Sequence, residues 1–214
     1  MPDEEITLLF QGDSITDAGR KRNEPAHLGS GYVNLVAGTL GFRHPKLPLN
    51  ILNRGISGNR SRDLLDRWEE DCLALRPQWF SLFIGINNTW RRFDQNDPTP
   101  PKVFEAELRE LVDMTIQCGV HPDCAVLMEP FLLDEPKGSK RDWFEDLIPK
   151  QNAVRKISEE FRTRWIPLQA IFNEALERAP AAHWAPDGVH PTPAGHYLIA
   201  QAWLNTMEEA IGAD

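Results

Sequence analysis

Short apolar runs alternate with longer amphipathic segments along most of this chain. The apolar runs predict β-strands at Ile6–Gln11, Asn50–Asn53, Trp79–Ile84, Ala125–Glu129 and Trp165–Leu168. Helical periodicity between them predicts helices at Tyr32–Leu40, Ser61–Leu75, Val103–Cys118, Lys150–Thr163 and Ala170–Arg178. A last helix is expected to begin at Pro193, with Thr192 as its N-cap.

This order of elements predicts an α/β fold with a parallel sheet that helices cover on both faces. No internal repeat, low-complexity tract or long linker divides the sequence, so residues 1–214 are read as one domain. Two stretches, Asn87–Pro101 and Pro130–Pro149, lack a regular pattern. They are long for plain connections, and we expect them to be loops that face a substrate.

Composition narrows the class of protein. The chain is 41% hydrophobic and 26% charged, which is ordinary for a globular enzyme, and its formal net charge of −9 argues against nucleic acid as a partner. No stretch approaches the roughly 20 apolar residues of a membrane span. The three cysteines show no metal-site spacing, and the acidic start Met1–Glu5 does not resemble a secretion signal. We therefore expect a cytoplasmic protein.

Polar segments that contain glycine follow the first three predicted strands. They are Gly12–Ser14, Arg54–Asn59 and Gly85–Asn88. Because the carboxyl ends of parallel strands lie at one edge of the sheet, all three segments are expected to meet there.

A serine near the start and an Asp–His pair near the end supply the groups of a nucleophilic hydrolase. We predict Ser14 as the nucleophile, His190 as its general base and Asp187 as the carboxylate that orients the imidazole. The backbone N–H groups of Ser14 and Gly58 and the side-chain amide of Asn87 are the predicted oxyanion donors.

Several neighbouring residues admit other interpretations. Asp13 is expected to be structural, and His196 falls within the last helix, where it would pack or cap. Trp90, Arg91 and Trp184 are candidate contacts for a sugar, although the tryptophans could equally anchor loops. No further ligand cluster accompanies the Asp–His pair, so no metal is expected.

Four blocks together resemble the SGNH hydrolases, or GDSL-type esterases, over nearly the whole chain. They are Gly12–Asp17, Gly55–Asn59, Gly85–Asn88 and Asp187–Pro191. The resemblance implies a flavodoxin-like three-layer α/β/α fold with about five parallel strands, acyl-ester hydrolysis, and neither a metal nor an organic cofactor.

The segments from Asn53 to Asp71 and from Gly85 to Arg91 look most like the intracellular acetylxylan esterases of this family. One departure is Asn88, where the family usually has an aspartate.

These observations lead to the expectation of a serine esterase that removes acetyl groups from carbohydrate, with acetylated xylo-oligosaccharides as the favoured substrate. Two alternatives remain open. One is a lysophospholipase or thioesterase of the same family, and the other is a carbohydrate-binding protein without catalysis. The sequence leaves the oligomeric state open, including a homo-oligomer.

Overall fold

The computed structural model describes residues 5–134 and 140–211, which form a five-stranded parallel sheet flanked by helices. Its strand order is β2-β1-β3-β4-β5, and every pair of neighbours is parallel. The strands are β1 (Ile6–Gly12), β2 (Leu49–Asn53), β3 (Trp79–Phe83), β4 (Ala125–Met128) and β5 (Arg164–Ile166). The predicted parallel sheet of about five strands is confirmed.

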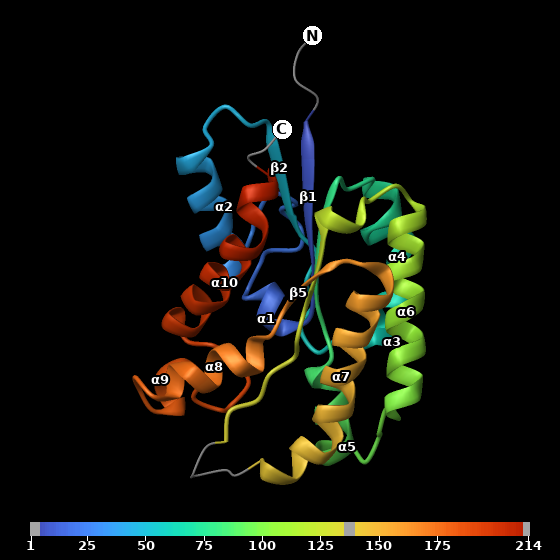
Figure 1. Cartoon of the computed structure of the whole chain (residues 1–214), viewed down its shortest axis with the longest axis vertical. Helices are drawn as coiled ribbons and strands as arrows, with labels where there is room; N and C mark the ends of the chain where they lie inside the picture. Colours follow the sequence, from blue (N-terminus) through green and yellow to red (C-terminus); the bar gives the residue numbers. More distant parts are fainter. Residues whose placement is uncertain (1–4, 135–139, 212–214) are drawn as a thin grey trace.

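Alternation along the strands divides the interior into two cores. Leu8 and Phe10 of β1 enter one core and Leu9 enters the other, and all three side chains are fully buried. One face of the sheet is covered by α2 (Tyr32–Arg43), α8 (Leu168–Leu176), α9 (Ala181–Trp184) and α10 (Pro193–Ile211). The other is covered by α3 (Ser61–Leu65), α4 (Trp68–Asp71), α6 (Pro101–Gln117) and α7 (Phe144–Phe161) (Figure 1). The three predicted layers are confirmed.

The helix predicted over Ser61–Leu75 is interrupted. It consists of α3, α4 and a 3-10 turn, η1 (Leu73–Leu75). The backbone leaves helical values at Arg67, whose φ is −123° and ψ is 9°. Its guanidinium donates to Asn59 Oδ1 at 3.0 Å and to Asp71 Oδ2 at 2.7 Å. The apolar pattern continues across the break and so did not reveal it.

The prediction of an irregular stretch over Asn87–Pro101 was wrong for its first half, which belongs to α5 (Ile86–Asp94). Ile86, Trp90 and Phe93 recur at helical spacing, but the polar Asn87, Asn88 and Thr89 on the buried part of this short segment obscured the pattern.

The stretch Pro130–Pro149 is also more regular than predicted. A 3-10 turn, η3 (Arg141–Trp143), leads directly into α7, which contains Pro149 within its first two turns. Residues 135–139, which the prediction of a loop included, lie outside the described residues.

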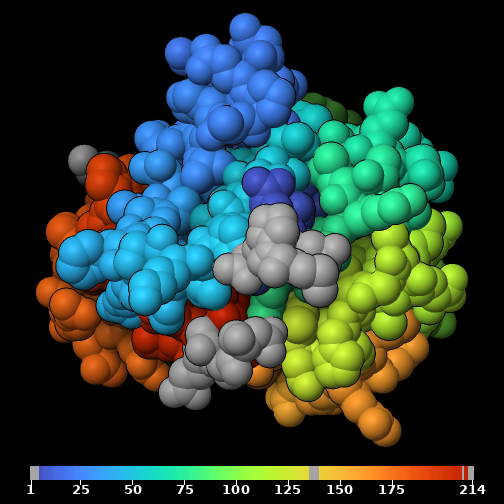
Figure 2. All heavy atoms as spheres, turned by 90° about the horizontal axis from the view of Figure 1, so that it is seen from above, coloured from blue at the N-terminus to red at the C-terminus, as the bar shows by residue number. Residues whose placement is uncertain are grey.

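The carboxyl ends of the strands point to the lower end of Figure 1, where α1 (Ser14–Asp17) follows β1 and α5 follows β3. In the sheet, β2 lies on one side of β1 and β3 lies on the other, so the strand order reverses at β1. In sheets of this kind, ligands usually bind in the crevice beyond the carboxyl ends of the strands where the order reverses. Residues 21–26, between α1 and α2, are exposed and belong to a segment that projects from the body of the molecule in Figure 2.

Among the residues that the structure describes, no helix has the length and apolar character needed to cross a membrane.

Candidate active site

The turn after β1 presents Ser14 at the first position of α1. Asp13 caps this short helix, because its carboxylate accepts the N–H of Ile15 at 3.0 Å. A Cβ on Gly12 would lie 2.3 Å from Thr16 Oγ1 and 2.4 Å from the carbonyl oxygen of Phe83. Only glycine therefore lets the end of β1 pack this closely against both α1 and β3.

The structure brings Ser14, His190 and Asp187 into one chain of hydrogen bonds. Ser14 Oγ lies 3.0 Å from His190 Nε2, although the two residues are 176 positions apart. His190 Nδ1 lies 2.6 Å from Asp187 Oδ2. The other carboxylate oxygen, Asp187 Oδ1, accepts the backbone N–H groups of Val189 at 2.9 Å and His190 at 2.7 Å. The carboxylate is thus fixed by its own loop.

That loop, between α9 and α10, packs against the segment after β4. The N–H of Leu133 donates to the carbonyl of Gly188 at 2.8 Å. Gly188 has a φ of +81°, and a Cβ there would lie 2.3 Å from the carbonyl oxygen of Leu133. Glycine at this position lets Asp187 curl back toward His190.

Electrostatics favour an ion pair between Asp187 and His190. Burial alone would raise the pKa of Asp187, but hydrogen bonds from the His190 side chain and from two backbone N–H groups hold it well below its ordinary value. The hydrogen bond to Asp187 raises the pKa of His190. A site with these shifts stabilises an imidazolium, the state that a histidine reaches when it takes a proton from serine.

The carboxyl group of Asp13 also acts electrostatically on the imidazole of His190, but unlike Asp187 it is almost fully buried. Its carboxyl group is buried, and burial raises its pKa to about 7. The observed capping bond agrees with the structural role expected for this residue.

The second and third blocks meet beside Ser14. Ile56 donates its N–H to the carbonyl of Gly12 at 3.1 Å, which holds the segment after β2 close to Ser14. Asn87 Nδ2 donates to the carbonyl of Asn59 at 3.1 Å. Among the described residues, the backbone N–H groups of Ser14 and Gly58 have no hydrogen-bond acceptor. Both donors are therefore available to a ligand.

Asp17 of α1 also holds the segment after β2 in place through Ser57. Its Oδ2 accepts the N–H of Ser57 at 3.0 Å and the Ser57 hydroxyl at 3.1 Å. These bonds connect α1 to the segment that carries Gly58.

Trp90 is the predicted sugar contact that lies beside the imidazole. Its ring centroid is 5.7 Å from that of His190 and 5.3 Å from that of Trp143. Arg91, on the same helix, is engaged otherwise, since its guanidinium bonds to Asp94 and reaches Asn87 Oδ1 at 3.4 Å.

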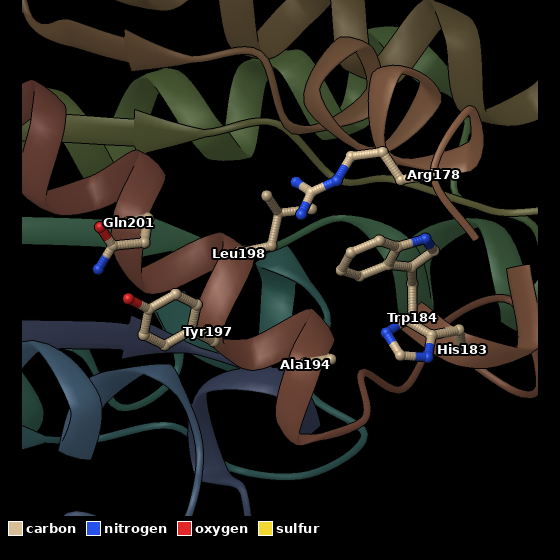
Figure 3. Close-up of a pocket in the computed structure, with 7 residues that line it drawn as sticks. All are labelled: Arg178, His183, Trp184, Ala194, Tyr197, Leu198 and Gln201. Atoms are coloured by element: carbon tan, nitrogen blue, oxygen red, sulfur yellow. The ribbon is translucent and has the colours of Figure 1, made fainter. Parts of the chain in front are cut away.

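Trp184 is the other tryptophan that was predicted to contact a sugar. Its indole is buried, and its N–H donates to the carbonyls of Ala175 and Ala179, both at 3.1 Å. It lines a pocket with Arg178, His183, Ala194, Tyr197, Leu198 and Gln201, and no residue of the Ser–His–Asp set lines that pocket (Figure 3). The structure thus does not bring Trp184 together with the residues around Ser14.

One residue of the site carried no signal in the sequence. Lys140, just before η3, donates from its ammonium to the backbone carbonyl of Asp187. A single lysine in an irregular stretch belongs to no motif, and nothing in its spacing relates it to Asp187.

His196 packs within α10, as expected from its place in the predicted helix. Its Nδ1 accepts the N–H of Tyr32 at 3.2 Å, and burial lowers its pKa to about 4. It therefore connects α10 to the start of α2 and stays neutral near pH 7.

An alcohol, an imidazole and a carboxylate in hydrogen-bond contact, beyond the carboxyl edge of a parallel sheet, are the groups of a nucleophilic hydrolase. Comparison with known proteins narrows this class to the carboxylic ester hydrolases. The GDSL-like lipase/acylhydrolase family matches residues 10–198, and this chain belongs to that family.

Two relatives illustrate the similarity. The acetylxylan esterase of Geobacillus stearothermophilus is 41% identical over 211 residues, which cover 94% of this chain and 93% of that protein. Its crystal structure superposes with a TM-score of 0.86 at 38% identity, covering 97% of this chain and 96% of the other. A putative GDSL-like lipase from Parabacteroides merdae superposes with a TM-score of 0.90 at 37% identity, covering 95% and 96%.

Proposed function

We infer that Ser14, His190 and Asp187 are the catalytic residues of an esterase that removes acetyl groups from xylo-oligosaccharides. The observation that carries this proposal is the continuous hydrogen-bonded chain, 3.0 Å from Ser14 Oγ to His190 and 2.6 Å from His190 to Asp187. Catalytic mutants of the Geobacillus stearothermophilus enzyme, in which a serine, an aspartate or a histidine is replaced by alanine, support it.

The reaction proceeds in two halves. Ser14 Oγ attacks the acetyl carbonyl carbon while its proton passes to His190 Nε2, and the resulting tetrahedral intermediate expels the sugar oxygen, which takes that proton. The acetyl group is then bonded to Ser14. Water gives one proton to His190 and attacks the acetyl carbon, and acetic acid leaves as that proton passes to Ser14 Oγ; the acid then ionises to acetate in solution. Asp187 holds the imidazole in the tautomer that both halves require.

The intermediate needs donors around its negative oxygen. The N–H groups of Ser14 and Gly58 would supply two of them. Asn87 would supply a third, because one N–H of its amide bonds to Asn59 and the other is left for the substrate. Arg91, which approaches Asn87 Oδ1, helps to orient that amide. Loss of one such donor typically costs on the order of 10²–10³ in kcat.

Two observations support an acetylated sugar as the substrate. The relative at 41% identity is an acetylxylan esterase, and one solved variant of it is described as an acetyl-xylooligosaccharide esterase. In addition, the indole of Trp90 lies beside His190, where an aromatic ring can pack on the apolar face of a sugar. We keep the cytoplasm as the expected location and leave the oligomeric state open.

The test is acetate release from a panel of acetylated xylo-oligosaccharides, compared with p-nitrophenyl acetate and p-nitrophenyl octanoate. We expect hydrolysis of the acetylated sugars and of the acetate ester, and a loss of at least about 10³-fold in kcat for Ser14→Ala. Thr39→Ala, which removes a hydroxyl bonded only to its own helix, is the matched control and should keep full activity.

Three outcomes would contradict the proposal. Preference for the octanoate ester would indicate a lysophospholipase or thioesterase. Failure of a fluorophosphonate to label the wild-type chain would indicate a binding protein. Acetate release by Ser14→Ala at the wild-type rate would exclude Ser14 as the nucleophile.

A further inference from the structure

Lys140 connects three parts of the molecule around the Asp187–His190 pair. Its ammonium bonds to the backbone carbonyl of Asp187. The same ammonium lies 4.9 Å from the ring centroid of Trp90 and 5.0 Å from that of Trp143. Since the Trp90 ring also lies beside His190, Lys140 connects α5 and η3 to the loop between α9 and α10 that carries Asp187 and His190.

This arrangement constrains both the lysine and the loop. Two aromatic faces attract the ammonium of the half-buried Lys140, and its bond to the carbonyl is a charge-assisted hydrogen bond. The carboxylate of Asp187 is fixed by N–H groups of Val189 and His190 on one side. Lys140 holds the carbonyl of the same residue on the other side, so the whole peptide of Asp187 is anchored.

The charges around His190 come from several elements. Asp187, on the same loop, and Asp13, at the end of β1, both favour its protonated form. Lys140 is the cation that opposes them. His196, from α10, is neutral near pH 7, and α5 contributes the uncharged Trp90.

From these contacts we propose that Lys140 is a positioning residue, which anchors the Asp187 peptide and places a positive charge beside the Asp187–His190 pair. The proposal rests on the catalytic roles inferred above for Ser14, His190 and Asp187. Two separate effects follow, one from the hydrogen bond and one from the charge.

The charge effect can be measured without catalysis. Histidine-labelled Ser14→Ala protein is titrated by NMR, with the His190 resonance assigned from the spectrum of a His190→Asn variant. Replacing Lys140 with Met in this background is expected to raise the pKa of His190 by roughly 0.5, the size expected for loss of a partly screened charge. Lys140→Arg should leave it unchanged. An unchanged pKa in Lys140→Met would overturn the charge effect, whatever the true substrate is.

The positioning effect appears in the kinetics of the active enzyme. In Lys140→Met we expect kcat to fall about threefold to tenfold with little change in KM, and the acid limb of kcat/KM to move to higher pH. Lys140→Gln lacks the charge but can still donate a hydrogen bond, so it should show the shifted limb with a smaller loss of kcat. If Lys140→Met fails to fold, Lys140→Gln provides the decisive titration.

Lys156→Met is the matched control, because it makes the same change in net charge at a surface lysine whose partner is Glu105. It should leave both the titration and the kinetics unchanged. Equal shifts in Lys156→Met and Lys140→Met would overturn the proposal, since they would reflect net charge alone. If Ser14→Ala still releases acetate, the proposed function fails while the titration of His190 remains a valid test of Lys140.

Discussion

At Asn88 the hydrogen-bond geometry explains why an amide stands where the family usually has a carboxylate. Its Nδ2 donates to Ser61 Oγ at 2.8 Å and to Thr99 Oγ1 at 3.3 Å, and its Oδ1 accepts the N–H of Ser61 at 3.2 Å. The Ser61 hydroxyl gives its own proton to Glu107 at 2.6 Å. Toward Asn88 the Ser61 hydroxyl oxygen can therefore only accept a hydrogen bond, and the amide N–H of Asn88 donates one to it.

We predict that Asn88→Asp destabilises the fold. The carboxylate would face the lone pairs of Ser61 in a fully buried place, with Glu107 nearby. An unsatisfied buried polar group costs about 1–3 kcal/mol. Urea unfolding at pH 7 measures the loss, and Asn173→Asp, in the exposed part of α8, is the control. Equal stability of Asn88→Asp and wild type would refute this interpretation.

At the scale of elements, Asp146 of α7 bonds both to a buried lysine on its own helix and to an arginine of α5, the helix that carries Asn87 and Trp90. Lys150 is fully buried and bonds to Asp146, four residues earlier on α7. Arg92 of α5 bonds to the other oxygen of Asp146 at 3.1 Å. Burial lowers the pKa of Lys150. Asp146 therefore compensates a buried cation and also holds α5 in place.

We predict that removal of the Asp146 carboxylate destabilises the protein strongly. In Asp146→Ala, Lys150 loses its partner inside the protein, and we expect a loss of about 3–5 kcal/mol in the free energy of unfolding. Glu159→Ala removes an exposed partner of Arg155 on the same helix and should cost less than about 0.5 kcal/mol. Urea unfolding compares the two. Similar losses in both variants would contradict a structural role for the buried pair.

At the scale of the whole molecule, buried titratable groups connect stability to pH. His196 has a folded pKa of about 4, below its ordinary value of 6.5, so the unfolded chain binds the proton more tightly between these values. Its contribution is complete above the unfolded pKa and is lost as the pH falls toward 4. Asp13, with a pKa raised to about 7, acts in the opposite sense and favours the folded state at low pH.

We predict that His196→Gln makes stability less sensitive to acid. The amide oxygen can still accept the N–H of Tyr32, but it has no proton to gain. Wild type should lose roughly 2 kcal/mol through His196 between pH 7 and pH 4.5. The variant should lack that part of the decline. Urea unfolding at both pH values measures the difference, and an identical decline in the two proteins would exclude His196 as its source.

The pattern of apolar and polar residues predicted those structural features that depend on residues close together in the sequence. The five strands, the parallel sheet and the capping of α10 by Thr192, whose Oγ1 accepts the N–H of Gly195 at 3.2 Å, agree with the sequence. The helix α5 escaped prediction because polar residues interrupt its short apolar pattern, although Ile86 and Trp90 lie four positions apart. The break at Arg67 escaped because it results from side-chain contacts with Asn59 and Asp71.

By itself, the sequence determined the order of the five strands and most of the helices between them, and it singled out the candidate reactive groups, since apolar periodicity and four short blocks are local properties. Tertiary structure alone decided which groups meet: Ser14 with His190, and Lys140 with the carbonyl of Asp187. It also placed Trp90 beside the imidazole and Trp184 in a pocket that no member of the Ser–His–Asp set lines. The physical reason is that such contacts depend on how helices pack against the sheet, which no spacing along the chain records.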